Sequence, residues 1–386
     1  MARPESGTPV VWRNLSPEPP GPAEWIDRQG VGREERQRFL RHVAIDAGDE
    51  LWRRFVAERH GTGVGMDGAA FVTERLHIEP VWGLGDDVLI AQGEPTCIVG
   101  PQGVGKSTLA QQVVLARLGL NDGSVLEYPV EEGYHVLYLA LDRPPQIARS
   151  LARMLDGDDA LRTVKEGLRV WRGALPVEPS RHPELFAEWV QDEGDQPDMV
   201  VVDSYKDVGG GALSDEDVAF NINRASQLVC LAGTEWVGLH HHRKATAGNA
   251  RPQKLDDVYG STWLTSGCGS VILLWGEPGA ARVELRHLKQ PMSTVGPLLV
   301  DHEHGTGISG AVEPDVAVER AVVAAGDRGL TEPTAAITLY GSGESSDRKR
   351  ARRVLDRLVN DGVLRFEPGT RGGSGGGGRP ARWWST

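Results

Sequence analysis

The sequence predicts an α/β fold in which helices flank a mainly parallel sheet, followed by a small C-terminal domain. Short apolar runs alternate with helical patterns from residue 96 to residue 275, which is typical of βα units around a parallel sheet. A phosphate-loop motif directly follows the first of these runs. After a boundary near residues 305–314, three helical patterns precede two short strand-like runs, which predicts a second domain.

The most informative segment is 100–108, which fits G-x-x-x-x-G-K-[ST]. Glycines let such a loop curl so that its backbone N–H groups point at phosphate oxygens. The strand-like run before the loop and the helical pattern after it direct a helix N-terminus at the phosphates. We expect Lys106 to reach the β- and γ-phosphates of ATP and Ser107 to hold Mg²⁺. The expected nucleotide-binding residues are Gly100, Pro101, Gln102, Gly103, Val104, Gly105, Lys106, Ser107 and Thr108.

Acidic residues end two further apolar runs. Asp203 ends the run 198–203, where a carboxylate would lie beside Ser107 and share the Mg²⁺. Asp142 follows the run 135–141, where an acid can polarise the water that attacks the γ-phosphate. The alternatives are a solvated strand end for Asp203 and a helix cap ahead of two prolines for Asp142. We favour the metal role for Asp203 and the catalytic role for Asp142.

Three histidines follow the apolar run 235–239. His240, His241 and His242 are adjacent, so their side chains cannot easily all face one metal ion. No cysteine or carboxylate stands at zinc-ligand spacing beside them. We therefore expect His240 or His241 to sense the γ-phosphate by hydrogen bonding, and an ordinary polar strand end is the alternative.

A long basic loop comes next, at 245–258. It lacks apolar periodicity, and loops of this length are usually functional or disordered. Its cations would grip the backbone of single-stranded DNA without reading base sequence, and a solvated loop is the equal alternative. The residues expected to contact DNA here are Arg243, Lys244, Arg251 and Lys254.

The C-terminal segment is basic although the chain is acidic. The net charge is −12, yet residues 346–386 carry ten Lys and Arg against four Asp and Glu. A basic end on an acidic body predicts a separate module with its own partner. Three helical segments followed by two strands match the plan of a winged helix. Duplex DNA is the expected partner and protein the alternative; the third helix would contact DNA through Arg348, Arg352 and Arg353.

Composition and length limit the remaining possibilities. No apolar run is long enough to cross a membrane, and the N-terminus lacks the apolar stretch of a signal peptide. The three cysteines are scattered, which indicates a reducing compartment. We expect a cytoplasmic protein without a membrane partner. Its predicted parts are a flexible and helical segment at 1–79, a nucleotide-binding domain at 80–305 and a winged-helix-like domain at 314–386.

The order of these motifs resembles that of the RecA-like P-loop ATPases. A phosphate loop, an acid after the next strand, Asp203-Ser204, a His-rich strand end and Gly260-Ser261 follow one another. Within that class, the chain is similar to the RepA-type hexameric replicative helicases, which are relatives of DnaB, over about residues 80–305. The histidines with the basic loop after them carry this finer resemblance.

The resemblance implies an ATPase site that is shared between subunits. The residues contributed by one subunit would be Lys106, Ser107, Asp142, Asp203 and one of His240 and His241. Arg286 and Lys289, at the end of a late strand, would reach the phosphate bound by a neighbouring subunit and stabilise charge in the transition state. The alternative for Arg286 is a surface position on its strand.

The expected function is that of an ATP-hydrolysing DNA motor. The resemblance implies a homo-oligomer, with six subunits expected, that uses ATP and Mg²⁺ and acts on single-stranded DNA in DNA replication as a helicase. One alternative is a DNA-binding regulator or helicase loader that ATP switches between assembly states. Another is a filament-forming recombination or repair ATPase without unwinding activity.

Overall fold

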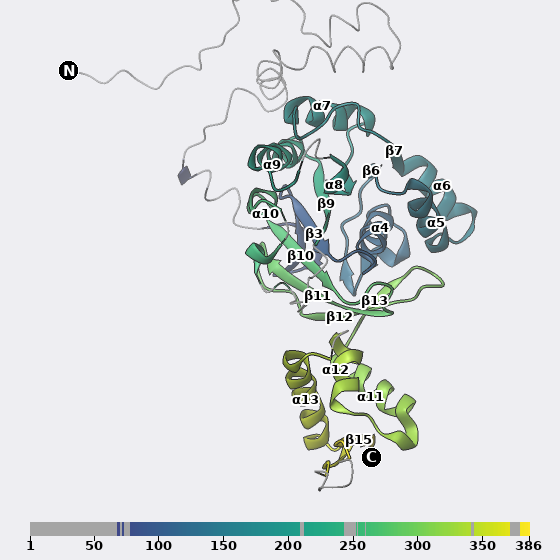
Figure 1. Ribbon diagram of the computed structural model, residues 1–386. Helices are drawn as coiled ribbons and strands as arrows, with labels where there is room; N and C mark the ends of the chain where they lie inside the picture. Colours follow the sequence, from purple (N-terminus) through teal and green to yellow (C-terminus); the bar gives the residue numbers. More distant parts are fainter. Residues whose placement is uncertain are drawn as a thin grey trace, which may run out of the picture.

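The computed structural model describes residues 68–69, 72, 78–208, 212–242, 252, 254–258, 260–340, 343–370 and 379–386. A nine-stranded sheet forms its centre, with strand order β13-β12-β11-β10-β3-β9-β8-β6-β7. Figure 1 shows helices on both sides of this sheet and a smaller helical module beyond β12. The predicted segment 1–79 lies almost wholly outside the described residues, and so do Arg243, Lys244 and Arg251.

Six neighbouring strands form the parallel part of the sheet. They are β7 (Leu168–Arg172), β6 (Val136–Ala140), β8 (Met199–Asp203), β9 (Glu235–His241), β3 (Thr96–Gly100) and β10 (Ser270–Trp275). Apart from the edge strand β7, they are almost entirely buried, as a sheet covered on both faces requires. Since the strands are parallel, their carboxyl ends meet at one edge. β9 lies between β3 and β8, so its end reaches that edge between the phosphate loop and Asp203.

Three antiparallel strands complete the sheet: β11 (Arg282–Lys289), β12 (Leu298–His302) and β13 (Ser309–Val312). The sheet therefore continues to Val312, and the predicted domain end at residue 305 falls inside the β12–β13 hairpin. The sequence Ser-Gly-Ala-Val is short and contains only one strong strand former, which explains why β13 is absent from the sequence prediction.

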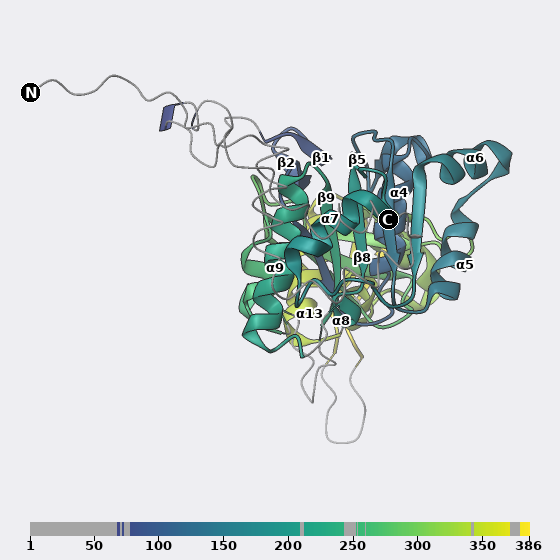
Figure 2. The same cartoon turned by 90° about the horizontal axis from the view of Figure 1, so that it is seen from above.

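Helices cover the two faces of the sheet, as Figures 1 and 2 show. On one side are α4 (Lys106–Arg117), α5 (Pro144–Met154) and α6 (Gly157–Gly167), and on the other α7 (Pro183–Glu193), α9 (Glu216–Leu231) and α10 (Trp263–Ser266); the short α8 (Tyr205–Val208) follows β8. The helix α6 is absent from the sequence prediction. Only Gly167 of it is buried, so it lacks the buried apolar stripe that marks a helix in sequence.

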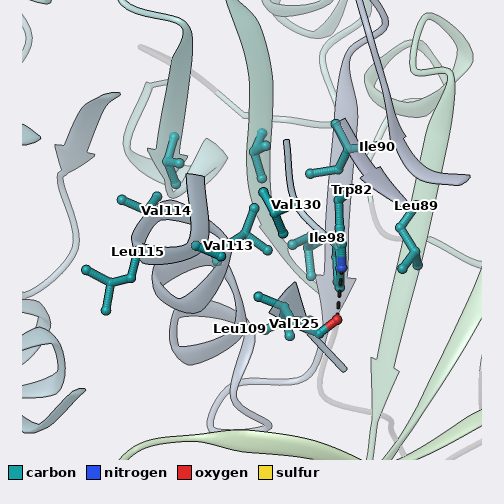
Figure 3. Close-up of a cluster of buried hydrophobic side chains, with 14 of the residues drawn as sticks. Trp82, Leu89, Ile90, Ile98, Leu109, Val113, Val114, Leu115, Val125 and Val130 are labelled. Carbon is teal, nitrogen blue, oxygen red and sulfur yellow. Dashed lines mark hydrogen bonds between the residues drawn. The ribbon is translucent and has the colours of Figure 1, made fainter. Parts of the chain in front are cut away.

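A separate hairpin of β1 (Pro80–Leu84) and β2 (Asp87–Ala91) packs against the α4 side of the core. Figure 3 shows Trp82 among the buried side chains there, with its indole Nε1 donating to the Val125 carbonyl, 3.1 Å away. Val125 belongs to the two-residue strand β4 (Ser124–Val125), which pairs with β5 (Tyr128–Pro129). This hairpin fixes the start of the sheet and the position of α4.

The C-terminal module consists of α11 (Pro314–Ala325), α12 (Glu332–Tyr340) and α13 (Ser345–Asn360), followed by the antiparallel strands β14 (Leu364–Glu367) and β15 (Arg382–Ser385). Leu330, between the first two helices, exchanges two backbone hydrogen bonds with Trp383, of 2.8 and 2.9 Å. Trp383 is fully buried and packs with Phe366 in the core of the module.

The module packs directly on the antiparallel half of the sheet. Side chains alternate along β12, so Val300 faces the main core while Leu299 belongs to the apolar cluster of the module. α12 contacts β11, and the Arg282 side chain on β11 lies within hydrogen-bond distance of the Thr338 carbonyl on α12, at 3.4 Å. The basic module predicted as a separate unit therefore shares an interface with the main sheet. No helix in the described part of the chain is long and apolar enough to cross a membrane.

Candidate nucleotide-binding site

A cavity of about 340 Å³ lies where β3, β6, β8 and β9 end. Five of the residues predicted for the ATPase site line it together: Lys106, Ser107, Asp142, Asp203 and His241. They come from four strand ends, and the parallel register places Ala140 opposite Asp203 and Gly100 opposite His241. The phosphate loop forms the floor of the cavity through Gln102, Gly103 and Gly105.

The loop conformation depends on glycine at two positions. Gly105, at the start of α4, has φ +90°, and a Cβ atom there would lie 2.5 Å from the His302 ring. A Cβ atom on Gly100 would lie 2.2 Å from the Leu274 carbonyl oxygen. Larger residues would therefore push the loop away from β10 and β12. This packing keeps the backbone of the loop directed into the cavity.

Lys106 lies at the mouth of this loop. Its ammonium donates to the carbonyls of Gly100 and Pro101, at 2.9 and 2.6 Å. Burial lowers the pKa of Lys106 to about 8, against the opposing effect of the Asp203 charge. The side chain is 5% exposed, so it is available only to a group inside the cavity.

Asp203 and Ser107 supply oxygen atoms beside Lys106. Asp203 is 4% exposed, and burial raises the pKa of its carboxyl group. Hydrogen bonds from Ser107 and from Tyr138, whose Oη lies 2.8 Å from Asp203 Oδ2, oppose that rise in pKa. A buried carboxylate next to a hydroxyl group fits Mg²⁺, which prefers oxygen ligands and retains several of its waters.

Asp142 and His241 form the opposite wall. His241 Nε2 lies 4.0 Å from Asp142 Oδ2. Burial, and after it the positive charge of Lys106, lowers the pKa of His241 to about 4. Its imidazole is therefore neutral at neutral pH and can both donate and accept a hydrogen bond. The Asp142 backbone N–H donates to the Asp203 carbonyl at 3.1 Å, which joins the two acidic strand ends.

The structure separates the two candidate sensor histidines. His240 is 1% exposed, and its ring centroid lies 6.0 Å from that of Tyr205 on the far side of β9. His241 points into the cavity because successive side chains of a strand face opposite sides. The geometry of a sensor is thus available to His241.

His302, which the sequence prediction misses, supports the loop from below. Its Nε2–H donates to the Val104 carbonyl at 3.1 Å, and its Nδ1 accepts from the Ser309 hydroxyl at 2.7 Å. The Gln112 side chain on α4 bonds the Ser309 hydroxyl and backbone N–H, at 2.9 and 2.8 Å. Burial lowers the pKa of His302, which favours this neutral tautomer. The β12–β13 hairpin is therefore fastened to both the loop and α4.

One wall of the cavity is formed by α5 and the β12–β13 turn, and it too is missing from the sequence prediction. Ile147 and Ser150 on α5 line the cavity, as does Gly307 in the turn. Arg153 joins the two segments by donating to the His304 carbonyl at 2.9 Å. No motif marks these residues, because their role depends on two segments that meet only in the folded chain.

The predicted finger residues lie elsewhere. Arg286 forms an ion pair with Glu284 on the face of β11 that meets the C-terminal module. Lys289 donates to the Ser266 carbonyl at 2.8 Å. Neither residue lines the cavity of its own subunit, and their action on a neighbouring subunit stays a prediction.

The predicted DNA contacts differ in their surroundings. Lys254 is exposed and pairs with Asp256 at 3.1 Å. Arg348 and Arg353 are exposed on α13. Arg352 instead lies against the aromatic side chains of the module, 4.8 Å from the ring centroids of Phe366 and Trp383, and bonds Asp356 at 2.7 Å. Its charge is therefore largely satisfied within the module.

A mainly parallel sheet between helices, with a phosphate loop after β3, is a RecA-like P-loop fold, and the chain contains a P-loop ATPase domain. A family model described as an AAA domain matches residues 75–247. No curated protein matches the chain. Among solved structures, one similar chain is the ATPase domain of another protein, at 12% identity and a TM-score of 0.44; the match covers 57% of this chain and 86% of that one.

Proposed function

We propose that this protein is an ATP-hydrolysing, oligomeric DNA motor that acts on single-stranded DNA as a replicative-type helicase. The observation that carries the proposal is the meeting of Lys106, Asp203, Asp142 and His241 in one cavity at the carboxyl edge of the sheet. Phosphate binding, metal binding, water activation and a link to the next loop are the functions that such a motor needs at one place.

Each residue has a chemical task in this proposal. Lys106 would exchange its two loop carbonyls for the β- and γ-phosphate oxygens. Ser107 and Asp203 would hold Mg²⁺, which neutralises charge on the phosphates. Asp142 would accept a proton from the attacking water, a contribution of about 10²- to 10⁴-fold in rate. The remaining nucleotide contacts would come from the backbone of residues 100–108.

His241 would connect hydrolysis to DNA. The neutral imidazole would hydrogen-bond the γ-phosphate, and it lies two residues before Arg243 and close to Lys244 in sequence. Loss of the phosphate would release His241 and shift the basic loop that follows it. This loop, with Arg251 and Lys254, would hold the DNA backbone through charge, which needs no particular base sequence.

The motor would work as a homo-oligomer, and a ring of six subunits is the form that we propose. Arg286 and Lys289 are absent from the cavity of their own subunit, which is compatible with action on a neighbour. For Arg286 this requires its guanidinium to exchange Glu284 for a phosphate oxygen. Such a finger would stabilise transition-state charge only across a subunit interface.

The C-terminal module, 314–386, would be a winged helix that contacts duplex DNA. Three helices followed by a β-ribbon support this proposal, as does the pairing of Leu330 with Trp383, which adds a third, minimal strand to the ribbon. Arg348 and Arg353 would face DNA, whereas Arg352 would support them from the module core. Residues 80–305, extended to the end of β13, would be the motor domain, and 1–79 a separate segment.

ATP turnover with and without single-stranded DNA tests the proposal. We expect hydrolysis that single-stranded DNA stimulates and that falls with rising salt, because the contacts are electrostatic. A strand-displacement assay with a forked duplex should then show ATP-dependent unwinding. Turnover that ignores single-stranded DNA would contradict a motor function.

One observation favours a second candidate, an ATP-switched DNA-binding regulator or loader. The C-terminal module packs on β11 and β12, close to the hairpin that supports the phosphate loop, so nucleotide and duplex binding would be coupled. ATP-dependent unwinding would favour the helicase, whereas site-specific duplex binding without unwinding would favour the regulator. Electron micrographs with ATP and single-stranded DNA would separate both from a recombination or repair ATPase, since that class would form filaments.

A further inference from the structure

Tyr138 occupies an unusual position at the back of the nucleotide cavity. It is the polar member of an otherwise aliphatic strand, β6, with the sequence Val-Leu-Tyr-Leu-Ala. The side chain is fully buried beneath α4, yet it does not line the cavity. Its hydroxyl donates to Asp203 Oδ2 at 2.8 Å, and the amide of Gln111 on α4 contacts the same hydroxyl.

The chemistry of this contact fixes its direction. Burial, together with the Asp203 charge, raises the pKa of Tyr138 well above its ordinary value, so the phenol keeps its proton and donates it to the carboxylate. The hydrogen bond opposes the rise in the pKa of Asp203 that burial causes. A donor on Oδ2 also limits rotation of the carboxylate and leaves Oδ1 for other partners.

We infer that Tyr138 is a positioning residue for the metal site, whose hydroxyl holds the Asp203 carboxylate in the orientation in which it binds Mg²⁺ with Ser107. This role rests on the proposed function of the cavity. It goes beyond that proposal because Tyr138 touches neither nucleotide nor metal and belongs to no motif. Partners of this kind around metal ligands typically change metal affinity about 10- to 100-fold when they are removed.

A purely structural role for Tyr138 predicts a different outcome. The aromatic ring fills the core between β6 and α4, and phenylalanine would fill it equally well. If packing were the whole role, Tyr138→Phe would leave metal binding unchanged. Only the hydroxyl group, which contacts Asp203 and Gln111, distinguishes the two residues.

The test is binding of a fluorescent ADP analogue to the full chain, first in EDTA and then across a Mg²⁺ titration. For Tyr138→Phe we expect unchanged affinity in EDTA and a Mg²⁺ midpoint about 10- to 100-fold higher than in the wild type. Tyr134→Phe is the matched control, since that tyrosine is 82% exposed, and its midpoint should equal the wild-type value. Equal midpoints in Tyr138→Phe and wild type would overturn the inference.

A second measurement separates this inference from the proposed function. Combined with Asp203→Asn, the change Tyr138→Phe should have no further effect on the Mg²⁺ midpoint, because Tyr138 acts through Asp203. Additive effects would contradict that route. A wild-type chain that binds no ADP would overturn both proposals, whereas Mg²⁺-dependent binding that Tyr138→Phe leaves unaltered would overturn only the role of Tyr138.

Discussion

Arg350 on α13 forms a two-fold hydrogen bond with the fully buried carboxylate of Glu284 on β11. The two nitrogens of its guanidinium lie 3.1 and 3.2 Å from the carboxylate oxygens. The same guanidinium lies 3.8 Å from the centroid of the Tyr340 ring. Arg286 bonds Glu284 from the sheet side. One buried carboxylate thus joins the C-terminal module to the strand that carries the predicted finger.

Replacing Arg350 by alanine should destabilise the protein. Glu284 would keep Arg286 but lose the partner that completes its neutralisation, and removing one member of a buried pair costs about 3 kcal/mol. Urea unfolding followed by fluorescence measures this change. Arg353→Ala is the matched control on the exposed face of α13, where we expect a change within about 0.5 kcal/mol. Equal effects of the two substitutions would mean that the pair with Glu284 contributes little.

Lys106→Ala should abolish ATP hydrolysis. The substitution removes the ammonium that the loop presents to the β- and γ-phosphates, and no other lysine of the described residues lines the cavity. A phosphate-release assay checks this outcome, with Lys165→Ala on the exposed part of α6 as the control that should keep wild-type turnover. Substantial turnover in Lys106→Ala would show that the cavity is not the active site.

The two histidines at the end of β9 should behave differently. His241→Ala should lose the stimulation of ATPase by single-stranded DNA while the free energy of unfolding stays within about 1 kcal/mol of wild type, because its side chain lies in the cavity. His240→Ala should mainly lower stability, because that ring is buried against Tyr205. Parallel ATPase and denaturation measurements decide the matter. A stable His240→Ala protein without stimulation would reverse the assignment.

Stability should fall as the pH drops from about 6.5 to about 4. Burial lowers the pKa of His287 from 6.5 to about 4, and that of His241 to a similar value. The unfolded chain therefore binds more protons than the folded chain within this window, so the free energy of unfolding rises with pH there. The slope is at most about 1.4 kcal/mol per pH unit for each histidine.

His287→Gln should flatten that slope, since glutamine does not titrate. The His287 ring lies between the Ser270 hydroxyl, at 2.8 Å, and the Val295 N–H, at 3.4 Å, so its neutral form is part of the fold. Urea unfolding near pH 7 and near pH 5 measures the slope, with His304→Gln in the exposed β12–β13 turn as the control. An unaltered slope in His287→Gln would exclude this histidine as a source of acid sensitivity.

Arg286→Ala subunits mixed into wild type should lower activity more than in proportion to their share. If Arg286 reaches a phosphate of the neighbouring subunit, each defective subunit impairs a site that is otherwise intact. ATPase activity measured over a series of mixing ratios gives the curve. A linear decline would argue against a finger that acts in trans.

The sequence was sufficient for the parts of the site that are contiguous or that end a strand. The phosphate loop is one segment, and Asp142 and Asp203 each end an apolar run, so parallel pairing brings them to the same edge. The choice between His240 and His241 was open, because the alternation of a strand cannot be phased from its sequence when both faces are buried.

Residues that act through tertiary neighbours were not predictable. His302 supports the loop only because β12 lies beneath it, and Tyr138 contacts Asp203 only because β6 and β8 are adjacent. The docking of the C-terminal module was likewise missed. Its charge suggested independence, whereas the contacts of Glu284 and Leu299 become visible only when β11 and β12 have paired.

The position of Leu299 has a consequence for how the molecule comes apart. This side chain belongs to the core of the module although it stands on the central sheet, so separating the two would expose apolar surface and the carboxylate of Glu284 to water together. Melting should accordingly be a single cooperative event that involves both parts. The shortest fragment that holds every phosphate-contacting residue would therefore not be the shortest fragment that folds.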